Sequence, residues 1–317
     1  MQTSVRELLH PELRGVLDAF VLPPLDSDQV SVLRDPDLIP ALSRAAELSG
    51  KVEITKRLAP ADPPVPVRVY RSVDASGPQP AIVAIHGGGY VMGFAAMYDT
   101  SFDRWCQTLG VVGVSVEYRL APETPYPGPL EDCYAALRWT HDNAHELGVD
   151  PSRIGIAGVS AGGGLAAGLA LLARDRNEVP VAFQLLDCPM LDDRSHTPSF
   201  QADDLFVWTR QANEFGWRAY LGDLYGTDRV PYCAAPARAT DLTRLPPAFV
   251  SVGAIDGFRD EDVDYALRLN QAGVPCELHV YPGVPHGYQM AQEAMVVRQA
   301  ARHIDDWLAA QLSSRPA

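Results

Sequence analysis

Lysine is nearly missing from this chain of 317 residues, which has only Lys51 and Lys56 among its 26 basic residues. Neither follows a glycine-rich loop, which argues against a phosphate-binding loop of the Walker type and against a Schiff-base enzyme. Positive charge is scarce in general, and the formal net charge is −14. We therefore expect neither nucleic acid nor an anionic membrane as the main partner.

Closely spaced cysteines and long apolar runs are missing as well. The five cysteines are widely separated, which gives no CxxC pair for zinc, iron–sulfur or thioredoxin chemistry and fits a reducing compartment. The first 25 residues carry charges where a signal peptide needs an apolar core. The longest apolar stretch, 162–173, is too short to span a bilayer. We therefore expect a soluble, cytoplasmic protein without membrane insertion.

Apolar runs alternate with helical patterns from residue 66 onward. A strand begins near residue 67, and the run 81–86 (AIVAIH) is typical of a strand buried on both faces. Further strands are predicted at 111–118, 153–157, 181–186, 248–252 and 277–281. Helical spacing occurs at 130–143, 164–176, 260–272 and 289–312. The alternation predicts an α/β protein with a doubly wound, mostly parallel sheet flanked by helices.

Two stretches fall outside this alternation. Residues 1–50 hold short helical segments that are broken by prolines. Residues 189–235 are rich in aromatic side chains, namely Phe200, Phe206, Trp208, Phe215, Trp217 and Tyr220. This insert either packs only on itself or also roofs a ligand cavity.

A strand–turn–helix motif, Gly158-Val159-Ser160-Ala161-Gly162, follows the strand at 153–157. The turn is so tight that bulky neighbours would clash, so Gly158 and Gly162 are needed two residues either side of the serine. The serine then projects above the sheet. We therefore expect Ser160 to be a nucleophile.

Three consecutive glycines, Gly87 to Gly89, follow His86 at the end of the strand 81–85. Without side chains in the way, their backbone N–H groups can face a ligand. Such donors stabilise the negative oxygen that develops during acyl transfer. Beside the serine turn, this loop predicts an oxyanion-binding site.

An acid and a base follow the last two predicted strands. Asp256 comes after 248–252 and His286 after 277–281, at the carboxyl ends of strands, where open α/β sheets place their sites. The order Ser160, Asp256, His286 is that of a serine triad on such a sheet. Asp256 is favoured because it lies nearest its strand. Three other acids of the same segment can instead cap the next helix or charge its first turn: Asp260, Glu261 and Asp262.

The sequence resembles the bacterial branch of the hormone-sensitive-lipase family of α/β-hydrolase carboxylesterases. The matching motifs are HGGGY at 86–90, EYRLAPE at 117–123, YPGPLEDCYAALRW at 126–139, IGIAGVSAGGG at 154–164, DGFRDE at 256–261 and HGY at 286–288. The resemblance covers nearly all of 65–315. It implies an α/β-hydrolase domain at 51–188 and 236–317, with a small helical cap made of 1–50 and the insertion 189–235.

The resemblance also implies roles for single residues. Ser160 is the nucleophile, His286 the base and Asp256 its orienting acid. The oxyanion hole is formed by the backbone amides of Gly88, Gly89 and Ala161. Structural support comes from His86, Gly87, Gly158 and Gly162. Candidate wall residues of the substrate pocket are Tyr90, Phe206, Trp208 and Tyr288. The chemistry requires no metal and no cofactor.

Hydrolysis of short- to medium-chain neutral carboxylic esters through an acyl-enzyme is the expected function, with a small-molecule ester as the partner. The same triad could instead act on an amide, a lactone or an acetyl group. A non-catalytic ligand-binding role is the remote alternative, since the plant gibberellin receptors resemble the family but lack the catalytic histidine. Members of the family often dimerise, so a homodimer stays open.

Three positions depart from the family pattern: Val159 stands where many members have Asp, Gly257 where Pro is usual, and Phe258 where Leu is common. None of them removes a catalytic group. Two other patterns carry little weight. A G-x-G-x-x-A match at 162–167 begins too far beyond its strand for dinucleotide binding. His141 and His145 have helical spacing but no third zinc ligand.

Overall fold

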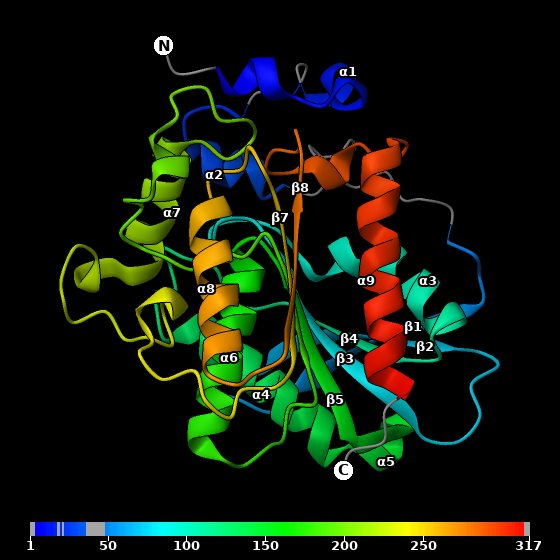
Figure 1. Ribbon diagram of the computed structural model, residues 1–317. Coiled ribbons are helices and arrows are strands. Elements are labelled where there is room, and N and C mark those ends of the chain that lie inside the picture. The colour runs from blue at the N-terminus through cyan, green and yellow to red at the C-terminus, as the bar shows by residue number, and fades with distance from the viewer. Residues whose placement is uncertain (1–3, 18–19, 21, 36–47, 314–317) are drawn as a thin grey trace.

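The computed structural model describes residues 4–17, 20, 22–35 and 48–313. Within them, one eight-stranded sheet has the order β1-β2-β4-β3-β5-β6-β7-β8 (Figure 1). The strands are β1 Val52–Ala59, β2 Val65–Ser72, β3 Gln79–Ile85, β4 Val112–Val116, β5 Val149–Val159, β6 Gln184–Asp187, β7 Ala248–Gly253 and β8 Cys276–Tyr281. Strand β2 alone runs against the direction of the other seven strands, so its pairings with β1 and β4 are antiparallel and all the others are parallel. The predicted α/β fold with a mostly parallel sheet is confirmed.

Helices flank this sheet and connect its strands. The α-helices are α1 Arg14–Leu17, α2 Ser27–Leu33, α3 Asp99–Thr108, α4 Gly128–Asp142, α5 Ala144–Leu147, α6 Ala161–Arg176, α7 Arg210–Leu221, α8 Arg259–Gln271 and α9 Met295–Ser313. Short 3-10 turns are η1 Val5–Leu8, η2 Pro11–Leu13, η3 Ala95–Tyr98, η4 Pro198–Gln201, η5 Gly222–Leu224, η6 Pro236–Arg238 and η7 Tyr288–Met290. In the part of the chain described here, no helix is long and apolar enough to cross a bilayer.

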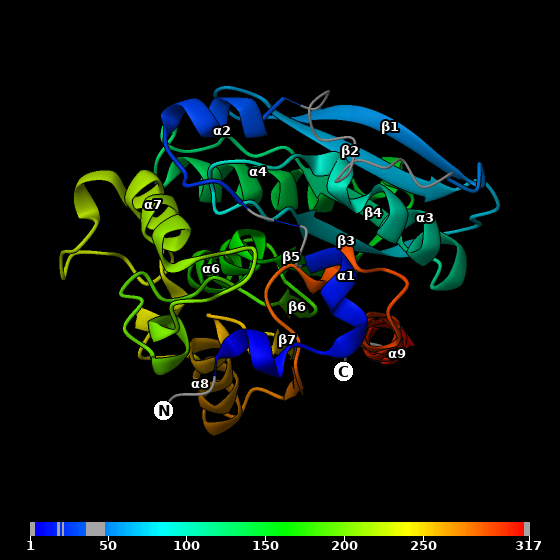
Figure 2. The same cartoon turned by 90° about the horizontal axis from the view of Figure 1, so that it is seen from above.

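Side chains along the central strands alternate between two apolar layers. In β3, Ala81, Val83 and Ile85 join the cluster that includes α4, α6 and α8. Ile82 and Ala84 face the other way, into the cluster that holds α3 and the end of α9. Figure 2 shows these two helical layers on opposite sides of the sheet. Because both faces are covered, the strand reads as a continuous apolar run rather than an alternating one.

The N-terminal turns lie over the carboxyl ends of the last strands. Figure 1 shows α1 above the ends of β7 and β8. Leu9, Leu13 and Leu17 pack in one cluster with Phe206 and Tyr288. The backbone N–H of His10 also donates to the carbonyl of Gly283. This segment therefore covers the edge of the sheet where the candidate triad lies. Residues 36–47 of the predicted N-terminal cap lie outside the described residues, and the cap boundaries stay a prediction.

The structure differs from the sequence analysis in three elements. Strand β1 was not predicted because all but one of its residues are exposed or only partly buried, so it has no apolar run. Helix α3 was not predicted because only three of its residues are buried. The closing helix was predicted to start at 289 and in fact starts at Met295. Residues 288–290 form a separate 3-10 turn after Gly287, whose φ is 74°.

Candidate active site

Three side chains from distant parts of the chain meet at the carboxyl edge of the sheet. Ser160 sits between β5 and α6, Asp256 follows β7, and His286 follows β8. The Oγ of Ser160 lies 3.0 Å from Nε2 of His286, and Nδ1 of His286 lies 2.8 Å from Oδ2 of Asp256. With Nδ1 protonated, the imidazole donates to the carboxylate and leaves Nε2 free to accept the hydroxyl proton. The three groups are all buried.

The serine occupies a strained turn. Its φ is 56° and its ψ is −123°, a backbone conformation that residues with a Cβ rarely adopt. An added Cβ on Gly158 would overlap the carbonyl oxygen of Gly162, and one on Gly162 would overlap the carbonyl oxygen of Ile85. The N–H of Ser160 donates to the carbonyl of Asp187 at 2.9 Å. Glycines on both sides thus let the turn close so tightly that the hydroxyl projects from the strand end.

The glycine loop after β3 lies against this turn. A Cβ on Gly87 would lie 3.3 Å from the Cβ of Ser160. Gly88 has φ 120° and Gly89 has φ 60°, so both positions favour glycine. In the described part of the chain, the N–H groups of Gly88, Gly89 and Ala161 have no hydrogen-bond acceptor. Ala161 is the first residue of α6, where a helix leaves its N–H free. These donors are available for a ligand oxygen.

His86 lies buried at the start of the glycine loop. It is fully buried, and burial lowers the pKa of its imidazole to about 4. Its ring stacks on that of Tyr118 with centroids 4.2 Å apart, and the Tyr118 hydroxyl donates to the His86 carbonyl. Its Nδ1 also lies 2.8 Å from the carbonyl oxygen of Gly87. These contacts fix the start of the glycine loop.

Asp256 is the acid that reaches the imidazole. Its second oxygen, Oδ1, accepts the N–H of Phe258, which fixes the plane of the carboxylate. The rival acids are used elsewhere. Asp260 accepts from the N–H of Ser199 and pairs with Arg259, while Glu261 accepts from the N–H groups of Leu191 and Asp192.

Gly257, where the family usually has Pro, lies in a turn that is held in place. Its carbonyl accepts the Ser199 hydroxyl at 2.6 Å, and an added Cβ would meet the ring of Phe200 at 2.8 Å. Phe258 packs its ring edge-to-face on that of His286, with centroids 5.0 Å apart. Contacts from the segment after β6 therefore hold the turn at Gly257.

Two fully buried carboxylates lie behind the acid. Both oxygens of Asp262 and one of Glu261 have no hydrogen-bond partner among the described residues. Burial, reinforced by neighbouring carboxylates, raises the pKa of each well above its ordinary value. These acids therefore tend to hold their protons rather than add negative charge near Asp256.

The loop 205–209 lies directly on the glycine loop and on the residue after His286. The Trp208 ring covers Gly89 so closely that any Cβ there would overlap it. Val207 packs against Gly287, whose added Cβ would lie 2.8 Å away, and has φ 57°, a strained value for a β-branched residue. Phe206 is buried beneath Arg6, whose guanidinium lies 4.7 Å from the ring centroid. Val207 and Trp208 of the insert thus lie against the loops that carry His286 and the three glycines.

Two of the candidate wall residues are placed differently from the prediction. The fully buried Tyr90 stacks on Tyr220 with centroids 4.1 Å apart and donates its hydroxyl to the Met190 carbonyl. Because no part of Tyr90 is exposed, its ring is not open to a ligand in this structure. Tyr288 turns its hydroxyl to Asp187 at 2.9 Å instead of toward a ligand.

Asp187, at the end of β6, was not recognised as a site residue from the sequence. Its carboxylate accepts hydrogen bonds from Ser251, Tyr288 and Gln289. Its position directly after the apolar run 181–186, like those of Asp256 and His286 after their own strands, was the available signal.

Potential metal ligands converge at one place in the described residues. The ligand atoms of Cys188, Asp256 and His286 all lie within 4.8 Å of one another. Since Nδ1 of His286 and Oδ2 of Asp256 already share a hydrogen bond, this group fits an acid–base pair better than a metal site. His141 lies on α4 beside Asp142, at 3.3 Å, and does not join it.

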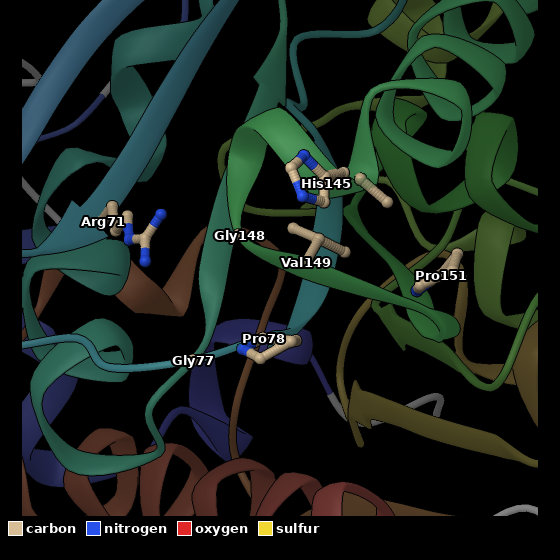
Figure 3. A pocket seen from close by; sticks show the side chains of 8 residues that line it. Arg71, Gly77, Pro78, His145, Gly148, Val149 and Pro151 are labelled. Carbon is tan, nitrogen blue, oxygen red and sulfur yellow. The ribbon is translucent and has the colours of Figure 1, made fainter.

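A hollow of about 500 Å³ lies at the opposite edge of the sheet (Figure 3). It is lined by Arg71, Gly77, Pro78, Ala144, His145, Gly148, Val149 and Pro151. Val149 begins β5 and pairs with Gln79 at the start of β3, so this hollow is far from the serine at the other end of β5. The Arg71 guanidinium donates to the Leu147 carbonyl.

Comparison with known proteins gives one consistent result. Residues 82–290 match the family described as having the alpha/beta hydrolase fold. The carboxylesterase NlhH of Mycobacterium tuberculosis is 37% identical over 97% of both chains, and esterase LipI of the same species is 36% identical over 71% of each. The solved structure of a bacterial heroin esterase is 43% identical, with a TM-score of 0.92 over 97% of this chain and 99% of the other.

Replacing each of the two candidate acids, Asp256 and Asp260, by Asn tests which of them orients His286. Asp256→Asn should slow covalent labelling of Ser160 by a serine-directed phosphonate by about 10³-fold or more, because the imidazole loses its orienting charge. Asp260→Asn removes only contacts to Ser199 and Arg259, and we expect less than about a tenfold loss. Intact mass measured over time gives both rates. The opposite ranking would assign the acid to Asp260.

Neutralising Asp262 should change how stability depends on pH. A raised folded-state pKa means that native stability falls as pH rises above about 4, where the unfolded carboxyl releases its proton. Asp262→Asn abolishes that loss, so its gain in urea midpoint over the native chain should be larger at pH 8 than at pH 4.5. The exposed Asp74, changed to Asn, is the matched control. Equal midpoint differences at both pH values would show that burial does not perturb Asp262.

Proposed function

Because the chain belongs to the hormone-sensitive-lipase-like family of α/β-hydrolase carboxylic ester hydrolases, we propose that it cleaves small neutral esters through an acyl-enzyme on Ser160. The resemblance drawn from its motifs is confirmed. The observation that carries the proposed site is the unbroken chain of contacts from Ser160 Oγ through His286 to Asp256, at 3.0 and 2.8 Å.

Acylation is the first half of the reaction. Ser160 Oγ attacks the acyl carbon while its proton passes to Nε2 of His286, so a C–O bond forms as the carbonyl π bond becomes an oxyanion. The free N–H groups of Gly88, Gly89 and Ala161 receive that oxyanion. A single donor of this kind is worth about 10²–10³ in rate. Asp256 holds the imidazole and stabilises its charged form.

Acylation ends when the imidazolium returns its proton to the leaving alcohol and the tetrahedral intermediate breaks the ester C–O bond, which leaves the acyl-enzyme. Deacylation then completes the cycle. Water then attacks the acyl-enzyme, with His286 again as the base, which frees the carboxylic acid and restores the serine hydroxyl. Every proton that moves is held by Ser160, His286, the substrate or water, so the cycle balances without a further reagent.

A neutral substrate with a short to medium acyl chain fits the surroundings of the serine. Trp208 is apolar and lies directly against Gly89 of the glycine loop, so it leaves little room for a long chain. The net charge of −14 disfavours anionic substrates at long range. We therefore propose small, uncharged carboxylic esters.

Other acyl compounds are the second candidate substrate class. An amide, a lactone or an acetyl group reaches the same acyl-enzyme, and the geometry of the triad favours none of them. A ligand-binding role without catalysis is disfavoured, since such a protein has no use for His286 at 3.0 Å from the serine hydroxyl.

Compartment and assembly are also proposals. All five cysteines are free thiols, which supports a reducing compartment such as the cytoplasm. A homodimer is supported by β8, which is an edge strand of the sheet and can pair with a second copy.

Removing the serine hydroxyl tests the proposed function. Ser160→Ala should keep the fold but lower kcat on nitrophenyl butyrate by about 10⁵-fold or more, and it should abolish phosphonate labelling. Ser152→Ala, at an exposed serine, is the control. The native chain is assayed beside it on nitrophenyl esters of rising acyl length, an anilide and a lactone. Turnover that survives in Ser160→Ala would refute the assignment, and a preference for anilide or lactone would change the substrate class.

Trimming Trp208 tests the limit on chain length. Trp208→Ala should raise the ratio of kcat/KM for octanoate over butyrate roughly tenfold or more, because each newly buried methylene contributes roughly 0.8 kcal/mol. Trp208→Phe should give an intermediate ratio. Trp105→Phe alters a buried indole on the other face of the sheet and should leave the ratio unchanged. An unchanged ratio in Trp208→Ala would mean that this ring does not bound the acyl site.

A further inference from the structure

Asp187 lies between the strands that carry the nucleophile and the acid. It ends β6, where it pairs with Val159 of β5 on one side and with Ser251 of β7 on the other. The serine turn begins one residue after Val159. Asp187 therefore lies at the end of β6, between the strand that leads to Ser160 and the strand that leads to Asp256.

Its backbone and side chain bind different parts of the site. The carbonyl of Asp187 accepts the Ser160 N–H at 2.9 Å. Its Oδ1 accepts the Tyr288 hydroxyl at 2.9 Å, and its Oδ2 accepts Nε2 of Gln289 at 2.7 Å. Tyr288 and Gln289 follow His286 by two and three residues. One residue thus connects the nucleophile turn to the loop that carries the base.

That loop needs an anchor close to the histidine. Gly287 follows His286 directly and has φ 74°, and glycine leaves its backbone more freedom than any other residue. The hydrogen bonds from Tyr288 and Gln289 to Asp187 restrict the chain on the far side of that glycine. Asp256 fixes the ring at Nδ1, but within the described residues its side chain makes no hydrogen bond to residues 287–289.

The hydrogen-bond partners of Asp187 favour its charged form. Gln289 and Tyr288 donate to it, and the hydroxyl of Ser251 is 2.7 Å from Oδ1. The pKa of Asp187 is raised, chiefly by burial, and these three bonds together with the attraction of His286 oppose that rise. The other titratable groups that influence this region are Tyr98, Cys188, Asp256, Asp262, Tyr281 and Tyr288 itself.

We propose that Asp187 is a positioning residue that fixes the His286 loop against the serine turn and stabilises the imidazolium as a second carboxylate. The proposal rests on the proposed function, in which His286 becomes positively charged during each acyl transfer. Asp187 acts through the loop and through its field, and Asp256 keeps the direct hydrogen bond to the ring.

Two variants distinguish the effect of the Asp187 charge from the effect of its hydrogen bonds. Asp187→Asn keeps the size but removes the charge, and Ser251→Ala removes one hydrogen bond and keeps the charge. We expect Asp187→Asn to lower kcat about 10–100-fold, with KM changed less than about threefold. On the acid side of its plot of kcat/KM against pH, the rise (the acid limb) should move roughly 0.5–1 pH unit lower. The reason is that an imidazole without the second carboxylate binds its proton less tightly. Ser251→Ala should leave the limb in place.

Three results would overturn the proposal. One is a native kcat in folded Asp187→Asn. Another is a loss of kcat with an unmoved acid limb, which is the signature of simple packing. The third concerns a second variant, Gln289→Leu.

If Asp187→Asn does not fold, Gln289→Leu decides, because it removes one hydrogen bond to Asp187 at a half-buried position. A several-fold loss of kcat at constant KM in Gln289→Leu supports the proposal, and unchanged kcat refutes it.

Failure of the proposed function would be recognisable separately. The pH dependence of phosphonate labelling at Ser160 reports the basicity of the imidazole without any ester substrate. If the native chain is labelled but hydrolyses none of the esters, the proposed function fails, and the labelling profile of Asp187→Asn still tests the role of Asp187.

Discussion

The strained turn at Ser160 is the constraint on which the rest of the site depends. A serine at φ 56° is held only because Gly158, Gly162 and Gly87 let three backbone segments approach within contact distance. That approach places the hydroxyl, the free N–H of Ala161 and the glycine loop within a few bond lengths of one another. The strain is offset by the buried sheet beneath it, where β5 lies between β3 and β6.

Much of the fold could be predicted from the sequence, because strands buried on both faces leave continuous apolar runs. The run at 81–86 is one such case, and the structure places it between two helical layers. Elements in which only a few side chains are buried have no continuous apolar run, so they could not be predicted in this way. Strand β1 is an edge strand with polar side chains, and α3 buries only Phe102, Trp105 and Cys106. The predicted start of α9 was wrong because residues 288–290 form a separate turn. The hydrogen bonds from residues 288 and 289 to Asp187 leave no pattern in the local sequence.

The candidate site shows the same division. Ser160, Asp256 and His286 were found because each follows a strand, and strands of a parallel sheet bring their carboxyl ends to one edge. The role of Asp187 depends on the register between β5, β6 and β7 and on side chains about 100 residues away. The contact of Trp208 with Gly89 likewise depends on how the insert folds back. Spacing along the chain carries neither kind of information.

The balance of charge around His286 follows from which buried acids keep a proton. Asp262 and Glu261 lie close behind the acid, but burial raises the pKa of each, so they favour the neutral form. His86, in the adjacent loop, is neutral because burial lowers the pKa of its imidazole to about 4. Asp187 differs from Asp262 because Ser251, Tyr288 and Gln289 donate to its carboxylate and oppose the effect of burial on its pKa. Such donors favour a carboxylate over a carboxylic acid, so they favour negative charge at the end of β6, beside the strand that carries Asp256.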